Sequence, residues 1–77
     1  MVYEKLREII ATQFGIEESS ITENTDIVGD LGADSLDVVE MMMSLEDEFA
    51  VTIEDDKIAE LKTVGDVVNY IAGKLAE

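Results

Sequence analysis

The sequence predicts an all-α fold, a small four-helix bundle with three long helices, one short helix, and a long loop between helices one and two. Apolar residues recur at helical spacing in separate stretches, and the 77 residues include no proline that would interrupt a helix. Leu, Ile, Val and Phe make up about 31% of the chain, above the roughly 20% below which an acidic chain is expected to be disordered. Because the chain has no repeat or linker, residues 1–77 are predicted to form a single domain.

The first helix is predicted over about residues 2–14, and Gly15 is a suitable C-terminal stop. Its apolar positions are Val2, Leu6, Ile9, Ile10 and Phe14. This amphipathic start differs from a signal peptide, and no apolar run approaches the ~18 residues of a membrane span. A soluble protein that starts at its own Met1 is therefore expected.

A long loop is predicted from Gly15 to Ser35, since this stretch shows no sustained period. Ile21, Ile27 and Leu31 are expected to pin the loop to the core. Loops of this length in compact domains are usually functional or disordered.

The strongest helical pattern runs from Ser35 to about Ala50, SLDVVEMMMSLEDEFA. At about 100° per residue one stripe must face the core, and it consists of Val38, Met42, Leu45 and Phe49. Leu36 and Met43 project among acids on the opposite side. The helix is therefore expected to have two apolar surfaces.

The segment VTIEDDKIAEL is predicted to hold the short third helix, although VTI alone could be a strand. Thr63 is the expected N-cap of the last helix, and Asp66 completes a weak capping box. The apolar positions of that helix are Val64, Val67, Val68, Ile71 and Leu75.

The formal net charge of −14 is concentrated in the middle of the chain, since Glu17 to Asp56 contains fourteen acids and no base. Such a chain would repel nucleic acid and anionic membranes. The absence of His and Cys excludes disulfides, thiolate or imidazole metal sites, and nucleophiles paired with histidine. We expect no catalytic residue and no specific metal site.

Ser35 begins the second helix, and its simplest interpretation is an N-cap, with Asp37 complementing the helix dipole. The approach GDLGAD is flexible and acidic, and Leu36 follows as an exposed apolar residue. This setting favours a hydroxyl that is presented to the active site of another protein.

The segment DLGADSLDVVEMMMSLEDEF resembles the signature of acyl carrier proteins, in which the serine of Asp-Ser-Leu carries a 4′-phosphopantetheine arm. The resemblance covers essentially the whole chain. It implies that Ser35 is the attachment residue, flanked by Asp34 and Leu36, and that a holo-acyl-carrier-protein synthase supplies the base and Mg²⁺. The chain would then be a carrier and not an enzyme, because the thiol that bears the thioester arrives on the arm.

Leu36, Glu40, Met43 and Asp47 follow one another at i, i+4, i+7 and i+11, a stripe that starts beside the serine. Apolar anchors among charges suit a surface that binds and releases quickly. The resemblance implies that enzymes of fatty-acid synthesis and acyltransferases dock here through basic patches. The full expected docking set is Asp37, Glu40, Met43, Glu46, Asp47, Asp55 and Asp56, with Asp34 beside the serine.

The resemblance also implies an expandable cavity for the acyl chain between the second and third helices. The residues expected to border it are Val28, Val39, Met42, Phe49, Ile53, Leu61 and Ile71. The discrete type found in bacteria and plastids fits best, and the start at Met1 favours the bacterial cytoplasm. We expect a monomer.

Alternatives remain open. The chain could serve another pathway as a polyketide, peptidyl or D-alanyl carrier. From a different class, it could be an acidic interaction domain, with Ser35 only a cap, that binds divalent ions loosely. A calcium-binding EF-hand loop does not fit, because starting the pattern at Asp26 puts Leu31 where glycine is required, and starting it at Asp30 puts Met41 at the terminal glutamate.

Overall fold

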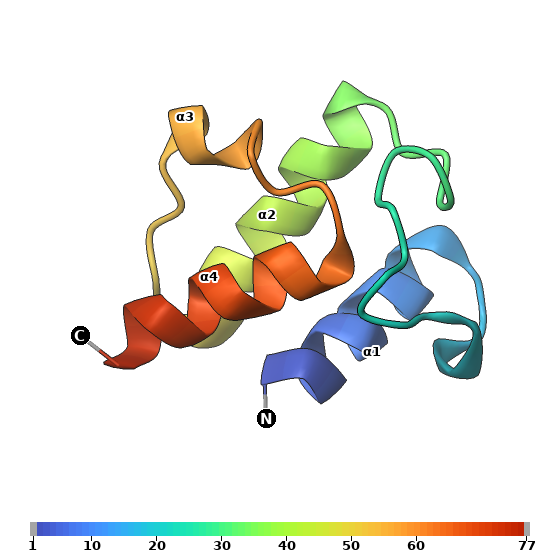
Figure 1. Ribbon diagram of the computed structural model, residues 1–77, viewed down its shortest axis with the longest axis horizontal. Coiled ribbons are helices and arrows are strands. Elements are labelled where there is room, and N and C mark those ends of the chain that lie inside the picture. The colour runs from blue at the N-terminus through green and yellow to red at the C-terminus, as the bar shows by residue number, and fades with distance from the viewer. Residues whose placement is uncertain (1, 77) are drawn as a thin grey trace.

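The computed structural model describes residues 2–76, which form four α-helices and one short 3₁₀ turn (Figure 1). In chain order they are α1 Val2–Phe14, η1 Glu18–Ser20, α2 Ser35–Phe49, α3 Asp55–Ile58 and α4 Val64–Ala76. The predicted all-α fold with three long helices and a short one is confirmed. The strand considered for VTI is not formed, because these residues run as irregular backbone into α3.

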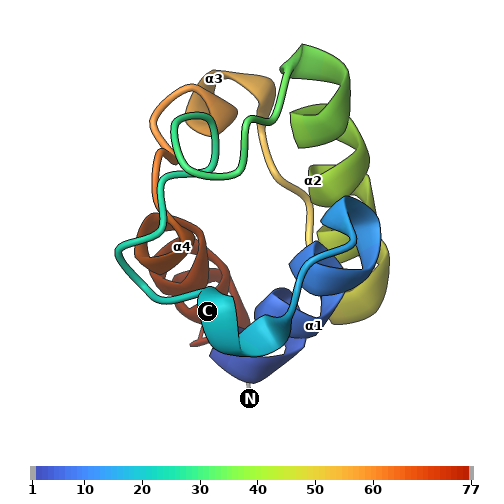
Figure 2. The same ribbon diagram turned by 90° about the vertical axis from the view of Figure 1, so that its right-hand side faces the viewer.

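The first helix is the centre of the helix packing. It lies against both α2 and α4, and the long loop follows it across one end of the bundle (Figure 2). The short α3 stands above α4, opposite the first half of α2. Within residues 2–76, no helix is both long enough and apolar enough to cross a membrane.

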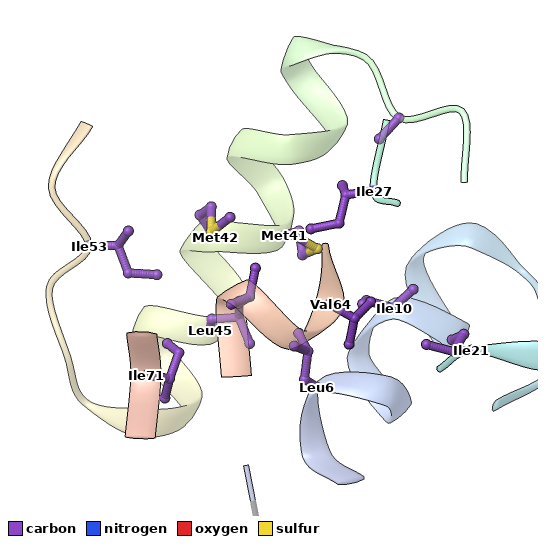
Figure 3. Close-up of a cluster of buried hydrophobic side chains, with 12 residues drawn as sticks. Leu6, Ile10, Ile21, Ile27, Met41, Met42, Leu45, Ile53, Val64 and Ile71 are labelled. Carbon is purple, nitrogen blue, oxygen red and sulfur yellow. The ribbon is translucent and has the colours of Figure 1, made fainter. Parts of the chain in front are cut away.

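The core is made where α1, α2 and α4 meet (Figure 3). Its fully buried members are Leu6, Ile10, Ile21, Ile27, Met41, Leu45, Val64, Val67 and Ile71. Of the stripe expected on α2, Met42 and Leu45 are buried, while Val38 and Phe49 are half-buried. Met41 is also part of the core, with no exposed area, although it lies outside that stripe.

Backbone hydrogen bonds fasten the long loop to the segment before α4. The amide of Ile27 donates to the carbonyl of Lys62 at 2.9 Å, and the amide of Gly65 donates to the carbonyl of Glu23 at 2.8 Å. A Cβ at Gly65 would lie 3.1 Å from that Glu23 oxygen, so the absence of a side chain permits this close approach. These contacts therefore hold the loop in an ordered conformation against the start of α4.

The N-terminus of α4 carries the predicted capping box. The hydroxyl of Thr63 accepts from the amide of Asp66, and Asp66 Oδ2 accepts from the amide of Thr63, both at 3.1 Å. The amide of Lys62 donates to the same carboxyl oxygen, also at 3.1 Å. The hydrogen bonds from the Thr63 and Lys62 amides lower the pKa of Asp66.

The second helix ends one residue before the predicted end. Ala50 is its C-cap, with a left-handed φ of 55°, and its amide donates to the carbonyl of Glu46. This conformation usually belongs to glycine. Because residue 50 is alanine and not glycine, the sequence does not indicate that the helix ends there.

Candidate functional site

Asp34, and not Ser35, caps α2. Asp34 Oδ1 accepts from the amide of Asp37 at 2.9 Å, and Asp37 Oδ2 accepts from the amide of Asp34 at 3.3 Å. The interpretation of Ser35 as the N-cap is therefore wrong, because this reciprocal pair already satisfies the helix end. Ser35 is the first residue inside the helix and is exposed. Within residues 2–76, its hydroxyl has no hydrogen-bond partner.

Ser35 lies at the edge of a groove of about 890 Å³. One wall is the loop from Asp26 to Asp34, another is the first turn of α2, and the third is the end of α3 with the residues after it. Its lining residues are Asp26, Ile27, Val28, Gly29, Ala33, Asp34, Ser35, Val38, Val39, Ile58, Ala59, Leu61 and Lys62. The lining is mainly apolar, so the groove can shelter an alkyl group held near the serine.

The loop wall of this groove is held by its own acids. Asp26 Oδ1 accepts from the amides of Val28 at 3.1 Å and Gly29 at 2.8 Å. Asp30 Oδ2 accepts from the amide of Asp26 at 2.8 Å. These hydrogen bonds fold residues 26–30, which precede Ser35 in the loop, into compact turns.

Comparison with known proteins decides the family. Residues 4–71 match the family model described as "Phosphopantetheine attachment site". The acyl carrier protein of Clostridium acetobutylicum is 47% identical over the full length of both chains, and that of Lactobacillus acidophilus is 49% identical over 91% of this chain and 88% of that protein. The solved structure of the acyl carrier protein from Enterococcus faecalis is 40% identical, with a TM-score of 0.83 over 95% of this chain and 92% of that one.

The chain belongs to the acyl carrier protein family. It has an acyl-carrier role, and its prosthetic group is 4′-phosphopantetheine. Acyl carrier proteins are carriers rather than catalysts, and fatty-acid synthesis is the usual context of the discrete bacterial members. The role implies contact with the enzymes of that synthesis.

The residues present fit this prosthetic group. Ser35 has an exposed, unpaired hydroxyl, a group that can form a phosphate ester, and the groove beside it is lined mainly by apolar side chains. Within residues 2–76, no cluster of three or more acidic side chains is placed to hold a metal ion.

The stripe expected on α2 is exposed as a unit. Leu36 and Met43 show 66% and 59% of their surface, and Glu40 and Asp47 are exposed beside them. Asp55 and Asp56 are also exposed, at the start of α3. These six residues are here called the docking face.

Two other acids of the expected docking set have structural partners. Asp37 belongs to the capping box of α2. Glu46 is half-buried, and its Oε2 accepts from the amide of Ile53 at 2.7 Å, which ties the segment before α3 to α2. Their hydrogen bonds separate them from the freely exposed acids.

The residues expected at the acyl cavity fall into two groups. Val28, Val39 and Leu61 line the groove, whereas Met42, Ile53, Phe49 and Ile71 belong to or pack against the core. Ala33, Val38, Ile58, Ala59 and Lys62 also line the groove and were missed. Val38 could have been found, since it lies one turn after Ser35, but α3 is brought to the serine only by the tertiary fold.

Proposed function

We propose that Ser35 carries the 4′-phosphopantetheine arm of a single carrier domain. The strongest support comes from the start of α2. Asp34 caps the helix there, and the hydroxyl of the neighbouring Ser35 is exposed and unpaired. When attached, the arm supplies the thiol that bears an acyl group as a thioester. The chain itself supplies the anchor and the groove. A holo-acyl-carrier-protein synthase supplies the base and Mg²⁺ for attachment, so the chain has no catalytic step of its own.

The test is coexpression with a phosphopantetheinyl transferase, followed by intact-mass measurement. The wild type should gain the mass of one prosthetic group, and Ser35→Ala should gain none. Ser44→Ala is the matched control, because Ser44 is an exposed serine further along the same helix and should leave loading intact. Loading of Ser35→Ala, or failure of the wild type to load, would refute the assignment.

We further propose that the docking face binds the basic patches of partner enzymes. Its two apolar side chains, Leu36 and Met43, alternate along α2 with the exposed carboxylates of Glu40 and Asp47. Complementary charge speeds the encounter, and a small apolar contact allows quick release. The serine lies at one end of this face, so docking brings the arm to the partner.

The acids of α2 allow a matched test of this face. Asp47→Lys should weaken association with a holo-acyl-carrier-protein synthase at low salt without lowering the melting temperature. Glu46→Ala should instead lower the free energy of unfolding by about 1 kcal/mol, because the Ile53 amide loses its acceptor. Undiminished association of Asp47→Lys with the synthase at low salt, or weakened association together with a loss of stability as large as that of Glu46→Ala, would contradict the docking role of Asp47.

We infer that the carrier serves fatty-acid synthesis as a monomer in the bacterial cytoplasm. The discrete bacterial relatives support this pathway over polyketide, peptidyl or D-alanyl transfer. The acyl chain would enter the groove past Val28, Val39 and Leu61. Mass spectrometry of the native thioester pool tests the pathway, since saturated and 3-hydroxy fatty acyl groups support it, and aminoacyl groups would overturn it.

A further inference from the structure

Lys62 differs from the other four basic residues of this chain in the partners of its charged group. Lys5 lies 3.8 Å from Glu8 and 3.7 Å from Glu48, and Lys57 lies 3.9 Å from Glu60. The remaining two bases, Arg7 and Lys74, stack over the rings of Tyr3 and Tyr70. Within residues 2–76, the Lys62 ammonium has no ion-pair partner inside 4.0 Å, although the chain has nineteen acids for five bases.

The place of Lys62 in the fold is fixed even though its ammonium is unpaired. Its carbonyl accepts from the amide of Ile27, and the carbonyl of Ile27 accepts from the amide of Ala33 at 3.3 Å. Two backbone hydrogen bonds therefore connect Lys62 to a residue two positions before Ser35. Lys62 and Ser35 line the same groove, and Lys62 is the only basic residue among the described residues that line it.

Apart from Lys62, the charged residues that line this groove are acidic. Asp34 and Asp26 line it, and Asp37 lies in the first turn of α2. A phosphodiester on Ser35 would add another negative charge among these carboxylates. The acid that competes for Lys62 is Asp66, whose pKa is lowered first by the backbone hydrogen bonds from Thr63 and Lys62 and least by the charge of the Lys62 ammonium. Asp66 already accepts those bonds, so the ammonium is not required there.

We propose that the Lys62 ammonium pairs with the phosphodiester of the arm attached to Ser35. This pairing turns the end of the arm nearest Ser35 toward the groove. Lysine binds phosphate as a point charge, and its flexible stem needs no preformed fork. The inference rests on the proposed attachment at Ser35. Lys62 is a positioning residue, because it acts on the arm and not on the thioester.

The direct test is ³¹P NMR of the loaded protein, with loading verified by intact mass. Lys62→Gln should move the phosphodiester resonance, and Lys62→Arg should restore it because the charge returns. Lys57→Gln is the matched control, since Lys57 does not line the groove. Raising salt to about 1 M, where the Debye length is about 3 Å, should move the wild-type resonance toward that of Lys62→Gln.

A second readout separates pairing from any structural role of Lys62. Loading should change the melting temperature of Lys62→Gln less favourably than that of wild type. The difference should be roughly 1–8 °C, the range expected for an exposed ion pair in a domain of this size. An unchanged phosphorus resonance and an equal effect of loading in both proteins would overturn the pairing and leave the attachment intact. Failure of the wild type to load on Ser35 would overturn both.

Discussion

At the scale of single residues, Asp34 caps α2 and leaves the Ser35 hydroxyl without a hydrogen-bond partner within residues 2–76. Asp34→Ala should lower the free energy of unfolding by about 1 kcal/mol, as loss of an N-cap usually does. Asp34→Asn should retain most of that stability, because the amide oxygen can still accept from the amide of Asp37.

The control for this prediction is Ser35→Ala, which should change stability by less than about 0.5 kcal/mol. Urea unfolding of the three variants, with equal m-values, measures the difference. A loss in Ser35→Ala as large as that in Asp34→Ala would contradict the assignment of the cap.

Asp66 gives a pH-dependent prediction at the same scale. Its pKa is lowered in the folded chain, chiefly by the amides of Thr63 and Lys62, from a value of 3.8. A depressed carboxyl pKa stabilises the fold above its unfolded pKa, and that stability is lost as pH falls through the folded pKa. Asp66→Asn should therefore be less stable than wild type at neutral pH, and the difference should shrink below about pH 4.

Urea midpoints of wild type and Asp66→Asn across this pH range provide the measurement. Asp47→Asn is the control, because Asp47 makes no side-chain hydrogen bond within residues 2–76, so this variant should not be less stable than wild type at neutral pH. A difference between wild type and Asp66→Asn that stays constant down to pH 2 would show that the charge of Asp66 does not stabilise α4.

At the scale of elements, the helices could be predicted because their signals are local. The spacing of Leu6 and Ile10, or of Val67 and Ile71, places each pair on one helical face whatever the rest of the chain does. The turn η1 and the end of α2 carried no such signal. The groove was only partly predictable, since Lys62 meets the loop through a long-range hydrogen bond from the Ile27 amide, which no short motif encodes.

The end of α2 yields a prediction about Ala50. Its left-handed backbone costs a residue with a Cβ roughly 1 kcal/mol and costs glycine little. Ala50→Gly should therefore raise the free energy of unfolding by up to about 1 kcal/mol, measured by urea unfolding. The control is Ala72→Gly, at an exposed position inside α4, which should lower it by about 1 kcal/mol. A loss in both variants would mean that Ala50 is not strained.

At the scale of the whole molecule, the core residues are spread along the chain, whereas the net charge is confined to its middle. The core unites α1, α2 and α4, whereas all the net charge lies between Glu17 and Asp56. The ion pair from Lys5 to Glu48 links α1 to α2 and offsets a little of this repulsion. The exposed acids of the proposed docking face therefore oppose folding, and binding of a basic partner would relieve that opposition.

This opposition should make stability depend on salt. Raising NaCl from roughly 0.01 M to 0.15 M shortens the Debye length from about 30 Å to about 8 Å, so the melting temperature should rise as repulsion among the acids is screened. Millimolar Mg²⁺ should raise it at lower ionic strength, because a divalent cation neutralises more charge per ion. The double variant Glu40→Gln, Asp47→Asn should start from a higher melting temperature in low salt and gain less from either cation. An equal gain in variant and wild type, or no response to salt in the wild type, would mean that the acidic centre does not strain the fold.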